Sequence, residues 1–185
     1  MSERFVERLF PAFLEIKDET LRELSERAME LAMERGGWNE SNIRLAPVTL
    51  NWLDCDVSWV EHVTDVTDMC LLEFDQMAKY YARHGVPFSR DTVAAGALLH
   101  DIGKLTEFAP GENGTVTHSG NWELMRHPLS GAIIAAQAGL PDNIVHLIAT
   151  HSFEGEKSYH TLESEFVRTV DIFVFQCSVK GLKKK

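Results

Sequence analysis

Apolar side chains recur every three or four positions along most of this sequence, which is the spacing of one face of an α-helix. The pattern predicts helices over residues 3–17 and 20–35, and Gly36-Gly37 ends the second of them. The other predicted helices cover 57–83, the stretch TVAAGALLHDIG, the segment from Pro128 to Gly139, 143–151 and 161–179. Residues 38–56 and 108–121 are predicted to be irregular, and no segment alternates as a strand does. An all-α fold is therefore expected.

Two of the predicted helices differ in how much of their surface is apolar. The stretch TVAAGALLHDIG is apolar nearly all round, so we expect this helix to be buried on most sides. The helix over 57–83 carries one stripe and ends at His84-Gly85. Its stripe consists of Val63, Val66, Cys70, Phe74, Met77 and Tyr81. Asp142 is a predicted cap for the helix over 143–151.

Helical geometry places the two histidines of the helix over 143–151 on different faces of that helix. At about 100° per residue, His151 shares one face with Ile144, Leu147 and Ile148. His146 points roughly 140° away from His151. We therefore expect His151 to face the core and His146 to be solvated.

Further polar residues lie where apolar ones are expected. Asp171 shares a face with valines, His62 lies on the inner side of the long helix, and His127 stands at a helix start. His100 and Asp101 adjoin each other at the end of the apolar run in ALLHDIGKL. Burying such groups costs about 2–7 kcal/mol each unless they are satisfied. Each residue alone fits a hydrogen-bonded core histidine or a capping aspartate, but a shared cation would satisfy all of them.

The order H…HD…D, formed by His62, His100-Asp101 and Asp171, resembles the signature of the HD-domain superfamily of metal-dependent phosphohydrolases. The likeness covers about residues 57–178, and LLHDIGKL is a specific form of the central motif. The stretch from GALLHDIGKL through VHLIATH also resembles the HD domains of bacterial 3′–5′ exoribonucleases. HPLSG and LPDNIVHLIATH resemble the histidine segments of the two-metal subgroup. The resemblance implies an HD-domain helical bundle at 38–185 with an N-terminal helical extension at 1–37, together one compact unit.

The resemblance also implies a set of site residues. The first metal would be bound by His62, His100, Asp101 and Asp171, and the second by His127 and His151 with Asp101 bridging. The catalytic residues would be Asp101 and Lys104, with Lys104 near the substrate phosphate. Alternatively, Lys104 is an ordinary lysine at the C-terminal end of a helix, where its charge interacts favourably with the helix dipole. Weaker candidates for substrate contact are His118, Arg126 and His160. Ligands without sulfur suit one or two Mn, Fe, Ni, Co or Zn ions per chain.

The activity implied by the resemblance is hydrolysis of a phosphomonoester or phosphodiester, of a nucleotide or an oligonucleotide, by a metal-activated water. Two alternatives stay open: an HD-type di-iron oxygenase, and a non-catalytic metal-binding HD sensor or scaffold. Thr150-His151 stands where many two-metal members have two histidines, which predicts a weaker second site. No GYP sequence follows HSFEGE, which disfavours cyclic-di-GMP as the substrate.

The net charge and the lengths of the apolar runs limit the kinds of partner that the protein is expected to bind. The net charge of −10 argues against binding double-stranded nucleic acid through a basic face. No apolar run approaches the roughly 20 residues that span a bilayer, and MSERFVERLF lacks the apolar core of a signal peptide. The expected protein is cytoplasmic, has no membrane partner and acts on a small phosphate ester or nucleotide. A homodimer through residues 1–37 is left open.

Overall fold

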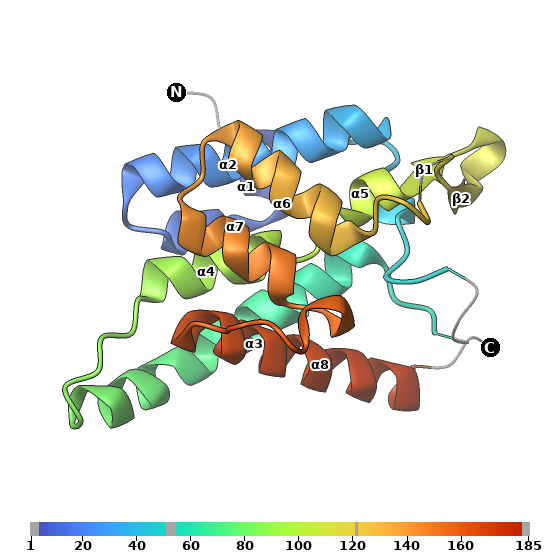
Figure 1. Ribbon diagram of the computed structural model, residues 1–185. Helices are drawn as coiled ribbons and strands as arrows, with labels where there is room; N and C mark the ends of the chain where they lie inside the picture. The colour runs from blue at the N-terminus through green and yellow to red at the C-terminus, as the bar shows by residue number, and fades with distance from the viewer. Residues whose placement is uncertain (1–3, 51–54, 121, 183–185) are drawn as a thin grey trace.

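A computed structural model describes residues 4–50, 55–120 and 122–182 (Figure 1). The described α-helices are α1 (Phe5–Leu9), α2 (Glu19–Gly36), α3 (Trp59–Ala82), α4 (Arg90–Leu99), α5 (Lys104–Glu107), α6 (His127–Ala138), α7 (Asp142–Thr150) and α8 (Leu162–Gly181). The strands are β1 (Phe108–Pro110) and β2 (Val116–His118). Short 3-10 turns are η1 (Pro11–Glu15), η2 (Ile43–Leu45), η3 (Glu112–Gly114) and η4 (Phe153–Gly155). The all-α prediction is confirmed, apart from one small hairpin.

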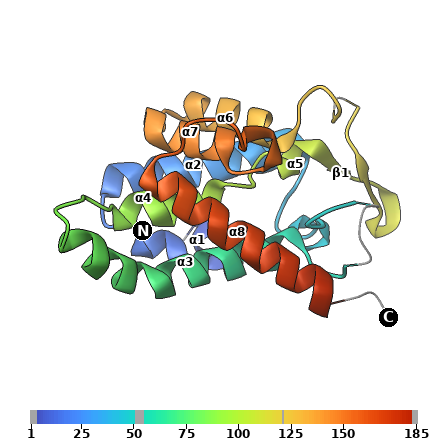
Figure 2. The same ribbon diagram turned by 60° about the horizontal axis from the view of Figure 1, so that its bottom comes forward.

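Helix α4 lies at the centre of the bundle. Its residues from Thr92 to Leu99 are all buried, as the apolar character of the sequence predicts. It packs against α3 and α8 on one side and against α2 and α7 on the other (Figure 1). Helix α8 crosses the face formed by α3 and α4 (Figure 2). The end of α4, where His100 and Asp101 follow, is therefore enclosed by helices.

Ends of the helices follow their local sequence signals. Asp18 caps α2 by accepting a hydrogen bond from Leu21 N at 2.9 Å. Gly37, with φ of 74°, ends that helix in the left-handed conformation that glycine adopts readily. Ser58 and Glu61 form a capping box at the start of α3. The predictions for α2, α3 and α6 are thus confirmed to within a few residues.

Three local predictions are wrong. The helix expected over 3–17 is broken, because Pro11 has no amide hydrogen to donate and starts the turn η1 instead. Asp142 is the first residue of α7 rather than its cap, since the extended Pro141 precedes the helix. The loop expected over 108–121 contains an antiparallel hairpin, with Phe108 opposite His118. Its strands are too short to show an alternating pattern.

The N-terminal residues share a core with the rest of the chain. One cluster of buried apolar side chains includes Val6, Phe13 and Met29 together with Leu98 and Ile148. The Asp91 carboxylate at the start of α4 accepts hydrogen bonds from the main chain at positions 17 and 18. Residues 4–37 therefore support the helix that leads into the HD pair. Within the described residues, no helix is both long and apolar enough to cross a membrane.

The stripe of α3 is buried over most of its length. Val63, Val66, Cys70 and Phe74 are buried, as the periodicity predicts. Positions 77 and 81 are only half-buried, because the last turns of α3 lie at the edge of the bundle (Figure 1). The first turns of α3, which carry His62, lie inside it.

Candidate metal centre

Helix ends and inner faces bring all the predicted metal ligands together. His62 lies in the first turn of α3, the HD pair follows α4, His127 begins α6, His151 follows α7, and Asp171 lies on α8. Two groups of ligand atoms are each confined within 4.8 Å: those of His62, His100 and Asp171, and those of Asp101, His127 and His151. Five separate elements thus converge on one point.

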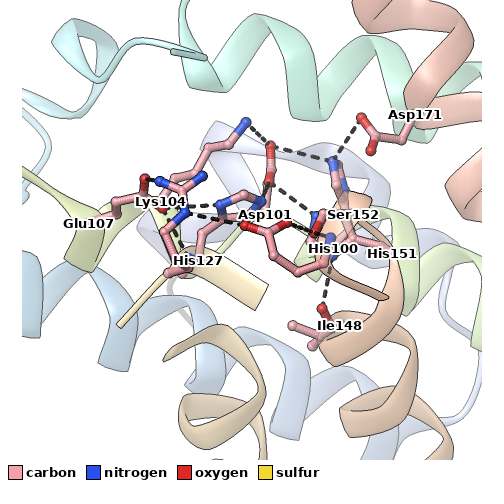
Figure 3. A network of polar contacts seen from close by, with 12 residues as sticks. His100, Asp101, Lys104, Glu107, His127, Ile148, His151, Ser152 and Asp171 are labelled. Carbon is pink, nitrogen blue, oxygen red and sulfur yellow. Dashed lines mark hydrogen bonds and ion pairs between the residues drawn. The ribbon is translucent and has the colours of Figure 1, made fainter. Parts of the chain in front are cut away.

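Asp101 lies between these two groups. Its Oδ2 is 3.4 Å from His62 Nε2 and 3.6 Å from His100 Nε2. Its Oδ1 is 3.4 Å from His151 Nε2 and 3.5 Å from His127 Nε2. Figure 3 shows Asp101 between His127 and Lys104 on one side and Asp171 on the other. Each oxygen of one carboxylate therefore faces one pair of histidines.

The spacing of the atoms around His62 suits a bound cation. His62 Nε2 is 3.3 Å from His100 Nε2 and 3.0 Å from Asp171 Oδ1. Atoms bound at about 2.1 Å to one ion are separated by roughly 3.0–3.4 Å in octahedral or tetrahedral geometry. His62 Nδ1 is buried without a hydrogen bond. Imidazole nitrogens with carboxylate oxygens are a donor set for divalent transition ions, so these residues fit a metal.

Main-chain carbonyls fix the orientation of two of the histidines. His100 Nδ1 is 2.7 Å from Ala97 O, and His151 Nδ1 is 2.8 Å from Ile148 O. A carbonyl oxygen only accepts, so both Nδ1 atoms carry the proton. When such a ring is neutral, its Nε2 presents a lone pair to the centre, which is the form that a metal requires.

His127 is oriented by a side chain that the sequence analysis missed. Glu107 Oε2 accepts hydrogen bonds from His127 N at 2.9 Å and from His127 Nδ1 at 3.0 Å. Glu107 is 3% exposed and its other oxygen pairs with Arg126. A glutamate directly before a phenylalanine, close to the HD pair in the sequence KLTEF, was the available signal.

Burial and neighbouring charges move the pKa values of the histidines in different directions. Burial lowers the pKa of His100 to about 4. Burial also lowers the pKa of His127, although its hydrogen bond to Glu107 works against this. Burial opposes protonation of His151 too, but the hydrogen bond to Asp101 and the charge of that carboxylate raise its pKa. His100 and His127 are therefore neutral and competent as ligands at neutral pH.

The two aspartates are held ionised. Burial alone would raise the pKa of Asp101, but Lys104 and the nearby histidines hold it well below its usual value. Burial would also raise the pKa of Asp171, but the hydrogen bond from His62 outweighs this effect and the pKa of Asp171 falls to about 2. Lys104 Nζ lies 2.7 Å from Asp101 Oδ2 and its side chain is 13% exposed. The lysine therefore supplies positive charge at the edge of the buried carboxylate.

The three residues predicted as weaker candidates for substrate contact each lie against another side chain in the structure. His118 stacks on Trp122 with ring centroids 4.1 Å apart. Arg126 pairs with Glu107 and with Glu154, and His160 Nδ1 lies 3.3 Å from a serine hydroxyl on α8. Contact of these three residues with a substrate stays a prediction, as does contact of Lys104 with phosphate.

His146 lies outside both groups of ligand atoms, in agreement with its predicted direction. The prediction that it is solvated is wrong, because it is only half-exposed and its ring lies 6.1 Å from that of Tyr159. Tyr159 belongs to the segment between η4 and α8. Thr150 Oγ1, next to His151, donates to His146 O at 2.8 Å and lies 3.3 Å from Ser164 Oγ.

Comparisons with known proteins agree with this geometry. The HD domain family matches residues 60–174. A dihydroneopterin 2′,3′-cyclic phosphate phosphodiesterase of Methanocaldococcus jannaschii is 31% identical over 150 residues, which cover 79% of this chain and 59% of that protein. The chain thus spans about three fifths of the length of this relative. No solved structure matches it. With most of its length matched and the HD pair at the centre of its buried histidine cluster, the chain belongs to the HD domain family.

Proposed function

We propose that this protein is a metal-dependent phosphohydrolase that acts on a small phosphate ester. The observation that carries the proposal is Asp101, whose two oxygens each face a separate pair of histidine Nε2 atoms. A carboxylate in this position can bridge two cations. The named activity of the similar archaeal protein, on a cyclic phosphate, supports the same class of reaction.

The ligands are proposed to divide as the two groups of atoms do. His62, His100 and Asp171 would hold the first ion, and Asp101, His127 and His151 the second, with Asp101 also reaching the first through Oδ2. Their nitrogen and oxygen donors suit Mn, Fe, Ni, Co or Zn. Such ions, when bound, lower the pKa of a water molecule and neutralise the oxygens of a phosphate ester.

Residues of the chain itself supply the remaining parts of the site. The neutral imidazoles of His100 and His127 keep their Nε2 lone pairs directed at Asp101. Lys104 Nζ is adjacent to the same carboxylate, so its ammonium is placed to donate to a phosphate oxygen that lies against the site. In hydrolysis, an oxygen from water bonds to phosphorus while a P–O bond breaks, and the leaving oxygen takes up a proton. Positive charge at the phosphate oxygens favours that step.

We propose a nucleotide-like small molecule as the substrate rather than a long polyanion. The chain carries a net charge of −10, which disfavours association with extended nucleic acid. The similar archaeal protein is named for a 2′,3′-cyclic phosphate of a pterin. Cyclic and linear phosphate esters of nucleosides and pterins are therefore the first substrates to test.

The test begins with elemental analysis of protein purified without chelator. The metal-loaded protein is then assayed with these phosphate esters, with and without oxygen. We expect release of a hydrolysed product that requires a divalent ion and proceeds in the absence of oxygen. A requirement for oxygen and reduced iron would instead identify an oxygenase. Bound metal without turnover of any ester would support a sensor or scaffold.

A further inference from the structure

One carboxylate oxygen of Glu107, at the end of α5, accepts hydrogen bonds from His127 alone among the described residues. Oε2 accepts both the main-chain N–H of His127, at 2.9 Å, and its Nδ1–H, at 3.0 Å. Glu107 is 3% exposed, so these bonds are made away from solvent. Hydrogen bonds to a buried charged group are among the stronger ones in proteins. The carboxylate therefore restrains both the backbone and the ring of this one histidine.

The need for Glu107 follows from the position of His127 in its helix. His100 and His151 come at the ends of α4 and α7, where main-chain carbonyls are free to accept from Nδ1. His127 comes at the start of α6, where the free main-chain groups are N–H donors. Its own helix therefore offers no carbonyl for Nδ1, and an acceptor from elsewhere in the fold must replace it.

A second side chain fixes the direction of the carboxylate. Arg126 pairs with Oε1 of Glu107 and also with Glu154, at 3.2 Å. Oε2 is thereby turned toward His127. The charge of Arg126 also offsets part of the cost of burying Glu107, so the arrangement is satisfied on both sides.

We propose that Glu107 is a positioning residue that sets the tautomer and the ligand strength of His127. The inference rests on the proposed function in one respect, namely that His127 binds the second metal. With the proton held on Nδ1, Nε2 is left to face Asp101 Oδ1 at 3.5 Å. A carboxylate that accepts from a ligating histidine makes the ring a stronger donor to the metal.

The first experiment measures the tautomer in the metal-free wild-type protein. Long-range nitrogen–proton NMR spectra of nitrogen-15-labelled histidine distinguish Nδ1–H from Nε2–H rings. We expect Nδ1–H for His127, and the same for His100 as an internal reference. Glu107→Ala should admit the Nε2–H form at His127 alone. An Nε2–H ring at His127 in the wild type would overturn the proposal, and this test needs neither metal nor activity.

The second experiment titrates Mn²⁺ into wild type, Glu107→Gln and Glu154→Gln. Glu154 is the matched control, since it pairs with Arg126 but, within the described residues, makes no hydrogen bond to the His127 ring. We expect Glu107→Gln to weaken one Mn²⁺ site about 10–100-fold and Glu154→Gln to leave it within about two-fold. In a His127→Ala background, Glu107→Gln should have no further effect on Mn²⁺ binding.

The outcomes separate this inference from the function it rests on. Equal Mn²⁺ affinity in wild type and Glu107→Gln, or an equal loss in both glutamine variants, would overturn the role of Glu107. A wild type that binds none of Mn²⁺, Fe²⁺, Ni²⁺, Co²⁺ and Zn²⁺ would contradict the proposed function, and the NMR result would still decide how His127 is held. If Glu107→Gln fails to fold, the tautomer in the wild type decides the question.

Discussion

Asp101 and Asp171 are both buried carboxylates, but they face different numbers of histidines. Asp101 approaches four imidazoles through its two oxygens, whereas Asp171 Oδ1 approaches only His62 and His100. At the residue scale, this difference would make Asp101 a ligand shared between the two proposed metal sites and Asp171 a ligand of one of them. Neutral amides are poor ligands compared with carboxylates, so asparagine variants test the division.

We expect Asp171→Asn to lose one metal equivalent and Asp101→Asn to weaken both. Each variant should lower turnover by about 100-fold or more, since it removes charge that holds the ions. Elemental analysis and steady-state kinetics measure the two effects. His146→Ala is the control and should keep the metal content of the wild type. Loss of metal in His146→Ala with none in Asp171→Asn would contradict the site.

Lys104 can be separated from the metal ligands by kinetics. If its ammonium contacts phosphate, Lys104→Ala should lower kcat/KM by about 100-fold. Metal content and the far-ultraviolet circular dichroism spectrum should stay as in the wild type, because the lysine contacts Asp101 from the edge of the cluster. Unchanged kcat/KM would show that the lysine serves only to neutralise the carboxylate.

At the scale of secondary-structure elements, the start of α5 comes unusually close to the start of α6. A Cβ atom on Gly103 would lie 2.0 Å from His127 O and 2.7 Å from Gly131 N, both in the main chain. Gly103 has φ of −65°, so space rather than backbone conformation requires glycine there. The glycine of the sequence HDIG thus permits the contact that brings His127 next to Asp101.

Gly103→Ala should therefore be strongly destabilising. Two main-chain segments would have to separate, and we expect a loss of about 2–4 kcal/mol in the free energy of unfolding. Urea unfolding measures the loss, and Mn²⁺ titration should show that the site containing His127 is the more weakened. Gly120→Ala is the matched control, since nothing lies within 4 Å of the added atom. Similar stabilities of the two variants would contradict the argument.

Periodicity predicted the elements whose apolar face is long, such as α3 and α8, because burial enforces the pattern over several turns. It missed the hairpin, whose strands of three residues include Pro110. The cluster of histidines and aspartates that is proposed to hold the metals could be predicted from polar residues on inner faces together with the family motif. Glu107 could not, because its role depends on a contact between α5 and α6 that no pattern within either helix encodes.

At the scale of the whole molecule, the buried histidines link stability to pH. In the metal-free protein the pKa of His100 is about 4, compared with 6.5 for an ordinary histidine. Between these pH values the unfolded chain binds a proton at this position that the folded chain does not. The contribution of His100 to stability is therefore present above pH 6.5 and is lost as the pH falls toward 4.

A comparison with His100→Asn isolates this contribution. The free energy of unfolding, measured with chelator across the same pH window, should rise more steeply with pH in the wild type than in the variant. The difference in slope should approach about 1.4 kcal/mol per pH unit. His151, whose pKa is raised, has the opposite effect on the pH dependence of stability. This effect is present in both proteins, so it largely cancels when their slopes are compared. Equal slopes would mean that His100 titrates normally in the folded state.

The position of Asp171 on the last helix has a consequence for the order of assembly. Asp101, His127 and His151 all precede α8 in the chain, but the group around His62 is complete only when α8 has docked. A cation bound there would link α8 to α3 and to the end of α4. Hydrogen exchange should therefore slow more in α8 than in α2 when Mn²⁺ is added, because α2 contributes no ligand. Equal slowing in both helices would contradict this, whereas selective slowing would make metal occupancy a sign that α8 has docked.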